Sequence, residues 1–184
     1  NIILASGSPR RQAFFKDLDI DYEIRLKEIE EIYPKELKGA EITDFLADLK
    51  SHPFKNELNE KDILITSDTI VWFENEALGK PKDYKDAFNM IKKMSGKKHD
   101  VITSISIKNK NFQKIVNDTT IVHFKELSDE EISYYINKYK PYDKAGAYGI
   151  QEWIGKIGIT KIEGSYFNVM GLPVHKLYKE LMNL

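Results

Sequence analysis

Apolar and polar residues along the chain follow the periods of short strands and amphipathic helices. Alternating or continuous apolar runs predict strands over residues 1–5, 22–26, 62–73, 100–107, 112–125 and 157–162. Apolar positions three or four residues apart predict helices over residues 9–18, 41–52, 83 or 86 to 94, 128–139 and 173–184. The second helix is expected to bury Ile42, Phe45, Leu46 and Leu49. The adjacent long strands, 100–107 and 112–125, fit the body of an extended sheet.

The strongest strand signal, residues 62–73, has an aspartate in its middle. Such an apolar run is typical of a central strand that is buried on both faces. A buried carboxylate is unfavourable unless it is ion-paired, hydrogen-bonded or bound to a cation. Asp68 is therefore a candidate site residue, and a structural aspartate satisfied by backbone donors is the alternative.

The first strand leads through a Ser-Gly-Ser turn, residues 6–8, into a helix. The glycine is free to adopt a positive φ, and Ser8 before Pro9 predicts the N-cap and first helical position. Unpaired backbone N–H groups at such a helix start favour an anion. Arg10 and Arg11 oppose the helix dipole, so a bound polyanion explains them better than helix propensity. A surface turn with two solvated arginines is the alternative.

Other turns contribute further candidate residues. Gly79 in Gly79-Lys80-Pro81 would allow close backbone approach, and Lys80 would project beside the end of the Asp68 strand. Residues 141–151, rich in Gly and Ala around an Asp-Lys pair, predict a binding rim. The loop over residues 27–34 is acidic, and a solvated loop is the alternative to a functional role for each of its carboxylates.

Composition narrows the classes of function. The 184 residues include 28 basic and 29 acidic side chains, a net charge of −1 that argues against a nucleic-acid-binding surface. No apolar run is long enough to span a bilayer, and no signal peptide precedes Asn1, so we expect no membrane partner. The absence of cysteine excludes disulfides and thiolate metal sites and is compatible with a cytoplasmic location. The four histidines share no metal-ligand spacing.

The basic and acidic candidates together suit phosphate chemistry. Phosphoryl and nucleotidyl transfer require positioned phosphates, neutralised charge and an aligned nucleophile. Mg²⁺ takes one or two carboxylates and otherwise water and phosphate oxygens. The residues that could clamp phosphates are Arg10, Arg11, Lys50 and Lys80, and those that could hold a divalent cation or orient water are Glu31 and Asp68. The glycine spacing differs from the P-loop and dinucleotide-binding patterns, and no Ser-His-Asp or cysteine nucleophile is evident.

Five motifs, in order along the whole chain, resemble those of the Maf proteins. They are Ser6-Gly7-Ser8-Pro9-Arg10-Arg11, Ser67-Asp68-Thr69, Gly79-Lys80-Pro81, DKAGAYGIQ at residues 143–151 and GSYFNVMGLP at residues 164–173. Each motif alone is weak, but the ordered set is specific. The family is known as nucleoside triphosphate pyrophosphatases and was first associated with inhibition of septum formation.

The resemblance implies a single domain, residues 1–184, with an elongated mixed α/β sheet flanked by helices. Two lobes with a central cleft, similar to inosine triphosphatase, are also implied. The implied reaction is hydrolysis of a nucleoside triphosphate between its α and β phosphates. A divalent cation, Mg²⁺ or Mn²⁺, is the implied cofactor.

The resemblance also implies residue roles. The general base falls on Asp68 and the metal-supporting glutamate on Glu31, with Glu30 as the adjacent alternative, and Asp68 and Glu31 are the implied metal ligands. Lys50 and Lys80 match phosphate-binding lysines, Lys80 also with a catalytic role, whereas residues 47–51 otherwise depart from the usual Arg-Glu-Lys-Ala type run. The phosphate loop falls on Ser6, Arg10 and Arg11, and base choice on Arg11, Thr69 and Gln151.

Residues 147–151 resemble the branch that hydrolyses dTTP and UTP. The amide of Gln151 offers a donor and an acceptor, which matches a pyrimidine edge with O4 and N3–H. Modified pyrimidine triphosphates are a further substrate class, and a homodimer is implied by resemblance alone. The alternative function is a nucleotide-responsive, non-catalytic regulator of division and septum formation. It would use Trp153 and the aromatic pair Tyr134-Tyr135 as a protein interface.

Overall fold

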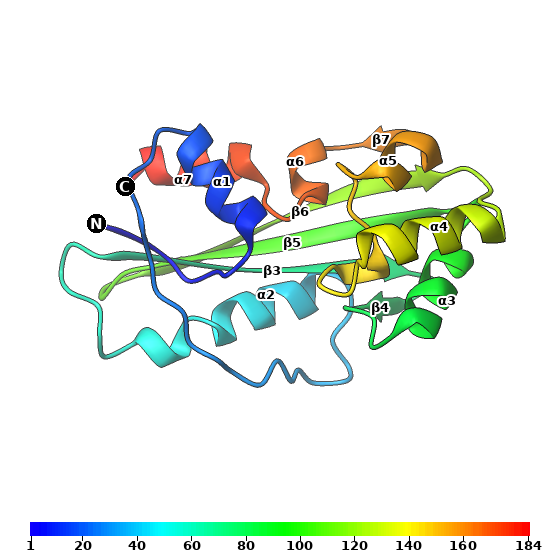
Figure 1. Cartoon of the computed structure of the whole chain (residues 1–184). Coiled ribbons are helices and arrows are strands. Elements are labelled where there is room, and N and C mark those ends of the chain that lie inside the picture. The colour runs from blue at the N-terminus through cyan, green and yellow to red at the C-terminus, as the bar shows by residue number, and fades with distance from the viewer. The chain divides into compact units, whose positions relative to one another are not determined.

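The structure, a computed structural model, describes residues 1–184 and has a mixed α/β fold with a seven-stranded open sheet flanked by helices (Figure 1). The strand order is β2-β1-β3-β5-β6-β7, and β4 pairs with β3. β1 is parallel to β2 and β3, whereas β4 is antiparallel to β3 and β7 is antiparallel to β6. The strands are β1 (Ile2–Leu4), β2 (Glu23–Ile24), β3 (Ile63–Phe73), β4 (Glu76–Leu78), β5 (Lys98–Lys108), β6 (Gln113–Phe124) and β7 (Ile159–Glu163).

The helices are α1 (Pro9–Asp17), α2 (Ala40–Leu49), α3 (Tyr84–Met94), α4 (Asp129–Tyr139), α5 (Trp153–Gly158), α6 (Tyr166–Val169) and α7 (Val174–Met182), with short 3₁₀ helices η1 (His52–Phe54) and η2 (Ala145–Ala147). The chain divides into two compact units. The first comprises residues 1–69, 103–118 and 171–184, and the second comprises residues 70–102 and 119–170. The strands β3, β5 and β6 therefore contribute residues to both units.

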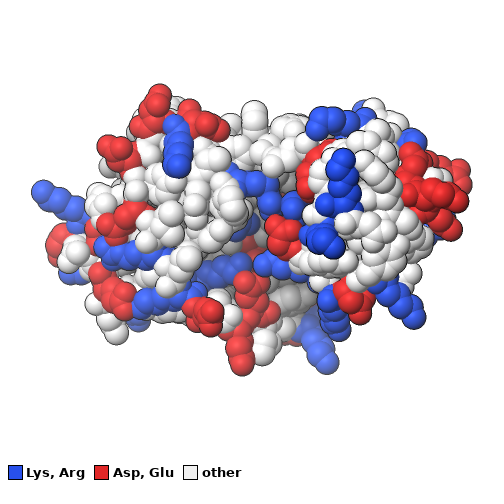
Figure 2. All heavy atoms as spheres, viewed as in Figure 1, with Lys and Arg blue, Asp and Glu red and all other residues white.

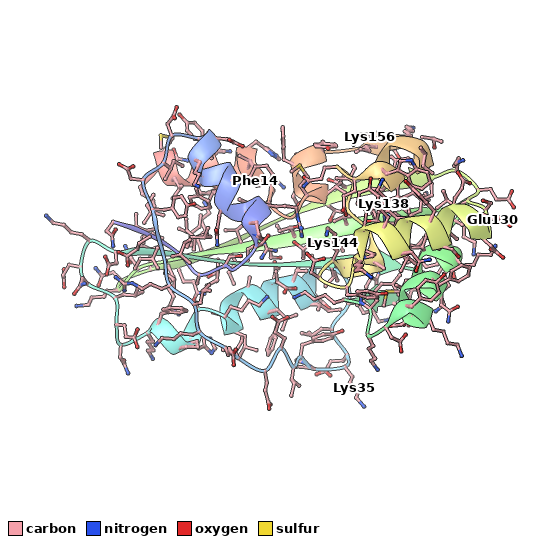
Figure 3. All side chains as sticks on the ribbon, viewed as in Figure 1. Phe14, Lys35, Glu130, Lys138, Lys144 and Lys156 are labelled. Atoms are coloured by element: carbon pink, nitrogen blue, oxygen red, sulfur yellow. The ribbon has the colours of Figure 1, made fainter.

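In the first unit, α1 and α7 lie on one face of the strands and α2 lies on the other (Figure 1). Phe14 and Phe15 of α1 are buried, and Phe14 is labelled on this helix in Figure 3. Ile3 and Leu64 pack with Phe54 of η1 in a separate buried cluster.

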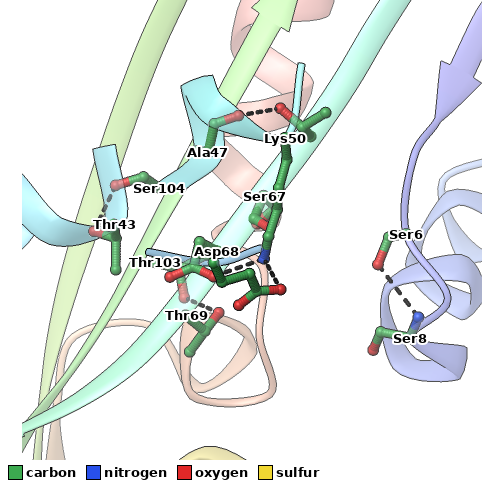
Figure 4. Close-up of polar contacts among 12 residues, drawn as sticks. Ser6, Ser8, Thr43, Ala47, Lys50, Ser67, Asp68, Thr69, Thr103 and Ser104 are labelled. Carbon is green, nitrogen blue, oxygen red and sulfur yellow. Dashed lines mark hydrogen bonds and ion pairs between the residues drawn. The ribbon is translucent and has the colours of Figure 1, made fainter. Parts of the chain in front are cut away.

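The buried face of α2 differs from the prediction. Ile42, Thr43, Leu46 and Ala47 are its buried residues, whereas the predicted core residue Phe45 is 37% exposed. Polar contacts with the sheet explain the difference: the Thr66 hydroxyl donates to the carbonyl of Ala47 at 2.5 Å, and the Ser104 hydroxyl donates to Thr43 at 2.7 Å (Figure 4). Small side chains allow this close approach, so the helix turns the bulky Phe45 outward.

In the second unit, α3 and α4 lie side by side (Figure 1). Its core joins residues of both helices, Ile91, Met94, Ile132 and Ile136, to residues from the strands and α5. His99 of β5 is buried in this core, where its Nε2 lies 2.5 Å from the Tyr148 hydroxyl and its ring packs at a tilt against Phe124. Burial lowers the pKa of His99 to about 3, so the ring is neutral.

Several small elements were absent from the sequence-based prediction. β4, α5 and α6 contain three, six and four residues, which is too short for a periodic signal. The predicted strand over 157–162 begins later, at Ile159, because α5 occupies residues up to Gly158. The predicted turn at residues 164–168 contains the start of α6, with Ser165 as its N-cap.

Charged residues of both signs are interspersed over the face shown in Figure 2. This distribution agrees with the near-neutral net charge of the chain. None of the helices combines the length and the apolar character that a membrane crossing requires.

Candidate active site

Asp68 is buried in the middle of β3, with 5% of its surface exposed. Its Oδ1 atom accepts a hydrogen bond from Lys50 Nζ at 2.7 Å (Figure 4). Its other oxygen, Oδ2, is buried and has no hydrogen-bond partner within the protein. Buried carboxylate oxygens are normally satisfied, so Oδ2 is the atom of this strand that most needs an external partner. The structural alternative, an aspartate satisfied by backbone donors, does not describe this carboxylate.

Lys50 joins Asp68 to the acidic loop. It directly follows α2, as its C-cap residue. Its ammonium lies 3.2 Å from Glu31 Oε1 and 3.4 Å from the carbonyl oxygen of Ser67, in addition to its bond with Asp68. The Lys50 side chain is 19% exposed. The ammonium of Lys50 thus connects Glu31 and Asp68, which lie far apart in the sequence.

The pKa of Asp68 is higher in the protein than in water, so its protonated form is favoured. Burial raises the pKa of Asp68, and the negative charge of Glu31 acts in the same direction. The positive charges of Lys50 and Arg11 oppose this shift. A carboxyl group whose pKa is raised by burial is better suited to accept a proton than a fully solvated one.

Glu31 is the member of the acidic loop that reaches Lys50. Residues 25–39 form no helix or strand, and the Glu31 side chain is 51% exposed. The side chain of the alternative residue, Glu30, is exposed, and its carbonyl accepts from the Ile32 N–H at 2.9 Å. The geometry therefore favours Glu31 over Glu30 as the carboxylate that shares Lys50 with Asp68.

The turn between β1 and α1 is held by its own serines. Ser8 is the N-cap of α1, as predicted, and its hydroxyl accepts from the Arg11 N–H at 3.5 Å. The buried Ser6 hydroxyl accepts from the Ser8 N–H at 3.3 Å (Figure 4). The turn does not use the conformational freedom of its glycine: Gly7 has no positive φ, and an added Cβ would meet only Leu26 at an ordinary 3.8 Å. The serine side chains, rather than the glycine, shape this turn.

Arg11 points into the first unit, and its guanidinium is fixed by three protein oxygens. Its Nε donates to the carbonyl of Gly171 at 2.8 Å, Nη1 to the carbonyl of Ser67 at 3.3 Å and Nη2 to the hydroxyl of Thr69 at 2.9 Å. These bonds bring Arg11 and Thr69, two residues expected to set base choice, into direct contact. Arg10, the adjacent arginine, is partly buried.

Two supporting residues were missing from the predicted site. The hydroxyls of Thr69 and Thr103 lie 2.9 Å apart, and Gly171, with φ of 119°, supplies the carbonyl that receives Arg11. Gly171 lies in the motif at residues 164–173, so the sequence marked it as a family position. Nothing in the sequence indicated that its carbonyl accepts from Arg11. Thr103 is one polar residue in an alternating strand, and the sequence carries no signal for its contact.

The remaining predicted site residues, Lys80 and Gln151, belong to the second unit and are exposed. The turn before Lys80 is joined to the 141–151 loop, because the Gly146 N–H donates to the Gly79 carbonyl at 3.1 Å. Only glycine fits at position 146, because its φ is 71° and an added Cβ would lie 2.7 Å from Val71 Cγ2. No atom lies within 4 Å of a Cβ added at Gly79, so the close approach expected there is absent within the protein.

The Asp-Lys pair of the 141–151 loop forms an ionic network. Lys144, labelled in Figure 3, contacts Asp143 at 3.0 Å and Glu152 at 3.5 Å. Glu152 also accepts from the Tyr135 hydroxyl at 2.8 Å, and that hydroxyl accepts from the Gly149 N–H. Tyr135 is completely buried, so its expected role in a protein interface is wrong. Trp153 is partly buried and packs edge-on against Tyr134.

The carboxylates at Lys50 fit a divalent cation that brings further ligands with it. Both carboxylates approach the same ammonium, Asp68 Oδ1 at 2.7 Å and Glu31 Oε1 at 3.2 Å, so the position between them already holds a positive charge. No cluster of three or more His, Asp or Glu side chains is arranged to hold a metal ion. Since Mg²⁺ is commonly bound by one or two carboxylates together with water and phosphate oxygens, Asp68 and Glu31 would suffice when a phosphate completes the site.

The overall fold is similar to that of the Staphylococcus aureus Ham1 protein, with a TM-score of 0.54 and 17% sequence identity over 97% of this chain and 98% of that protein. This likeness places the chain in the Ham1 fold class. The chain belongs to the Maf family: the family described as Maf-like protein matches residues 1–184.

Curated relatives match over the full length of the chain. A Flavobacterium johnsoniae protein named dTTP/UTP pyrophosphatase is 64% identical over 183 residues, which is 100% of this chain and 94% of the relative. A Bacteroides fragilis protein of the same name is 47% identical over 184 residues, covering 100% of this chain and 95% of the relative. The resemblance inferred from five motifs is thereby confirmed at the level of the family.

Proposed function

We propose that the protein is a nucleoside triphosphate pyrophosphatase that hydrolyses dTTP and UTP to the monophosphate and pyrophosphate. Membership of the Maf family and the names of its relatives support this assignment. The structural observation that carries it is Asp68, a buried carboxylate with one oxygen held by Lys50 and the other without a protein partner. A purely structural carboxylate would not leave a buried oxygen unsatisfied.

In the proposed reaction, Asp68 Oδ2 accepts a proton from a water molecule whose oxygen attacks the α phosphorus. The bond between the α phosphorus and the oxygen that bridges to the β phosphorus breaks, and its electron pair leaves with pyrophosphate. In the protein without substrate, Lys50 occupies Oδ1 and leaves Oδ2 as the oxygen that can accept the proton. Burial raises the pKa of Asp68, which strengthens it as a base.

Charge on the triphosphate must be neutralised for attack on the α phosphorus. We assign phosphate contacts to Ser6, Arg10, Arg11, Lys50 and Lys80, of which Lys80 would stabilise the leaving pyrophosphate. Asp68 and Glu31 would hold Mg²⁺ or Mn²⁺. When bound there, the cation would neutralise phosphate charge and polarise the phosphoryl oxygens.

We assign recognition of the nucleobase to Arg11, Thr69 and Gln151. The Arg11 guanidinium has five N–H donors, three of which are directed to Gly171, Ser67 and Thr69. This fixation gives Arg11 one orientation, which suits recognition of a carbonyl oxygen such as O4 of a pyrimidine. Gln151 would supply the donor and acceptor for the neighbouring O4 and N3–H edge.

The test is a panel of the common ribo- and deoxyribonucleoside triphosphates and modified pyrimidine triphosphates, each with Mg²⁺ or Mn²⁺. Pyrophosphate and orthophosphate are quantified separately. We expect pyrophosphate, chiefly from dTTP and UTP. Reaction in ¹⁸O-labelled water should place the label in the monophosphate, because the proposed attack is on the α phosphorus. Label in pyrophosphate or release of orthophosphate would contradict the proposal.

The same measurements separate the enzyme from the non-catalytic regulator. A regulator would bind dTTP or UTP in a calorimeter and release no product. The Asp68→Asn variant should retain nucleotide binding and lose most turnover, since the amide cannot accept the proton. Full activity in that variant would exclude Asp68 as the base.

A further inference from the structure

Lys50 occupies a position between two carboxylates, where a cation is required. Its Nζ lies 2.7 Å from Asp68 Oδ1 and 3.2 Å from Glu31 Oε1. The third acceptor is the carbonyl of Ser67, at 3.4 Å. The ammonium thus makes hydrogen bonds to Asp68 and Ser67 and an ion pair with Glu31. The arrangement in Figure 4 shows the Lys50 side chain extended toward Asp68.

The two carboxylates need this positive charge. The Asp68 side chain is only 7% exposed, and both it and Glu31 are negatively charged when ionised. Like charges at a shared, partly buried position repel unless a cation lies between them. Lys50 is the basic residue that contacts both carboxylates. The ammonium therefore compensates the pair when the protein is alone.

A divalent cation on the same two oxygens would compete with the ammonium. Mg²⁺ requires ligand distances of about 2.0–2.1 Å, so a metal held by Asp68 Oδ1 and Glu31 Oε1 would fill the space next to Nζ. It would also face the repulsion of an adjacent positive charge. No cluster of three or more His, Asp or Glu side chains is available. The protein alone therefore supplies too few ligands for a metal to displace the Lys50 ammonium.

We propose that Lys50 acts as an internal placeholder for the divalent cation, released from Asp68 and Glu31 when a triphosphate attracts its ammonium. This inference rests on the proposed function, since it takes the substrate to be a triphosphate. The phosphate oxygens give the ammonium a new anionic partner and give the metal its missing ligands. Metal and nucleotide therefore bind with positive coupling, and each raises the affinity for the other by the same factor.

The test is the affinity of the full-length protein for Mn²⁺ alone, measured by electron paramagnetic resonance or calorimetry. Lys50→Met keeps an unbranched side chain and removes the charge. We expect Lys50→Met to bind Mn²⁺ at least about tenfold more tightly than wild type, in line with the usual size of coupling between sites. Lys50→Gln provides a second neutral variant if Lys50→Met does not fold.

Lys108→Met is the matched control, because Lys108 donates to the Ser51 hydroxyl in the same unit without contacting Asp68 or Glu31. Its Mn²⁺ affinity should equal that of wild type. A non-hydrolysable dTTP analogue, cleaved at neither phosphate bridge, should raise Mn²⁺ affinity strongly in wild type and less in Lys50→Met. Unchanged or weaker Mn²⁺ binding by the folded Lys50 variants would overturn the placeholder role.

These outcomes are independent of the activity assay. Pyrophosphate release by wild type without tighter Mn²⁺ binding in the Lys50 variants would reject the placeholder and keep the proposed function. Tighter Mn²⁺ binding without pyrophosphate release from any triphosphate would keep the placeholder role at the carboxylates and reject the proposed function.

Discussion

The guanidinium of Arg11 donates a 2.9 Å hydrogen bond to the hydroxyl of Thr69. Thr69 follows Asp68 directly, so this contact connects Arg11 to the strand that carries Asp68, the proposed general base. The Thr69 hydroxyl also lies 2.9 Å from the Thr103 hydroxyl. A small change at Thr69 should therefore alter how Arg11 is held without removing the Arg11 guanidinium or the Asp68 carboxylate.

Replacing Thr69 with valine should weaken discrimination between bases. Valine has nearly the same shape but no acceptor, so Nη2 of Arg11 loses one of its fixed partners. We expect the kcat/KM preference for dTTP and UTP over the other triphosphates to fall by about tenfold. Thr119→Val, at an exposed position of β6, is the matched control and should keep the preference. An unchanged preference in Thr69→Val would show that Arg11 needs no support from this hydroxyl.

Asp68→Asn should stabilise the fold while it removes activity. Burial raises the pKa of Asp68, so the folded protein binds this proton more tightly than the unfolded chain. The ionised side chain then opposes folding, and the wild type loses stability relative to the variant as the pH rises through the Asp68 pKa. We therefore expect the variant to gain stability relative to the wild type as the pH rises. Urea unfolding of both proteins from about pH 4 to about pH 8 checks this; a variant less stable than wild type throughout would contradict it.

Glu31→Gln and Glu30→Gln should separate the two neighbouring acids. Glu31 contacts Lys50, whereas Glu30 does not. We expect Glu31→Gln to lower kcat/KM at saturating Mg²⁺ by at least about tenfold and Glu30→Gln to leave it near wild type. Because the Glu31 side chain is half exposed, its ion pair should change the free energy of unfolding by less than about 1 kcal/mol. Equal losses of activity in both variants would place the function in the charge of the loop rather than in Glu31.

His99 should make the fold sensitive to acid. Burial lowers the pKa of His99 from 6.5 to about 3. The unfolded chain therefore binds a proton below about pH 6.5 that the folded protein does not, and stability is lost as the pH falls from there toward 3. The slope from this group reaches at most about 1.4 kcal/mol per pH unit. His99→Gln keeps a hydrogen-bonding partner for Tyr148 and should show a shallower loss in urea unfolding between about pH 6.5 and about pH 4.5. An identical slope would show that other groups dominate.

Gly146→Ala and Gly79→Ala should differ sharply in stability. A Cβ at Gly146 would lie 2.7 Å from Val71, and φ there is 71°. We expect a loss of about 2–4 kcal/mol from overpacking and backbone strain. Gly79 has open space around its Cβ position, so Gly79→Ala should change the free energy of unfolding by about 0.5 kcal/mol or less. Thermal unfolding followed by circular dichroism compares the two; similar values would contradict the different environments of these glycines.

Local signals in the sequence were sufficient for the elements that bear the site. The Ser8 N-cap and the buried strand around Asp68 appear as predicted, and the helix predicted over residues 128–139 starts with a capping box of Ser128 and Glu131. Each depends on residues that are adjacent or a few positions apart. The roles that the family motifs imply for residues within those elements stay predictions.

What the sequence could not predict depends on contacts between distant segments. The exposure of Phe45 follows from polar contacts between α2 and the sheet. Lys50 was expected to bind phosphate, yet its contacts with Asp68 and Glu31 span 18 and 19 positions and carry no periodic signal. Only the alternative function placed Tyr135 at an interface, whereas its hydroxyl is directed inward to Glu152.

The bond from Arg11 to the carbonyl of Gly171 joins residues 160 positions apart. Ribosomes release the N-terminal segment first, so a nascent chain holds its arginine long before the acceptor has been synthesised. A chain that stops before Gly171 could form the capped helix at Ser8 but could not fix the guanidinium. The orientation of Arg11 seen in the structure, and with it the proposed recognition of the nucleobase, is therefore completed only when the C-terminal residues have been synthesised.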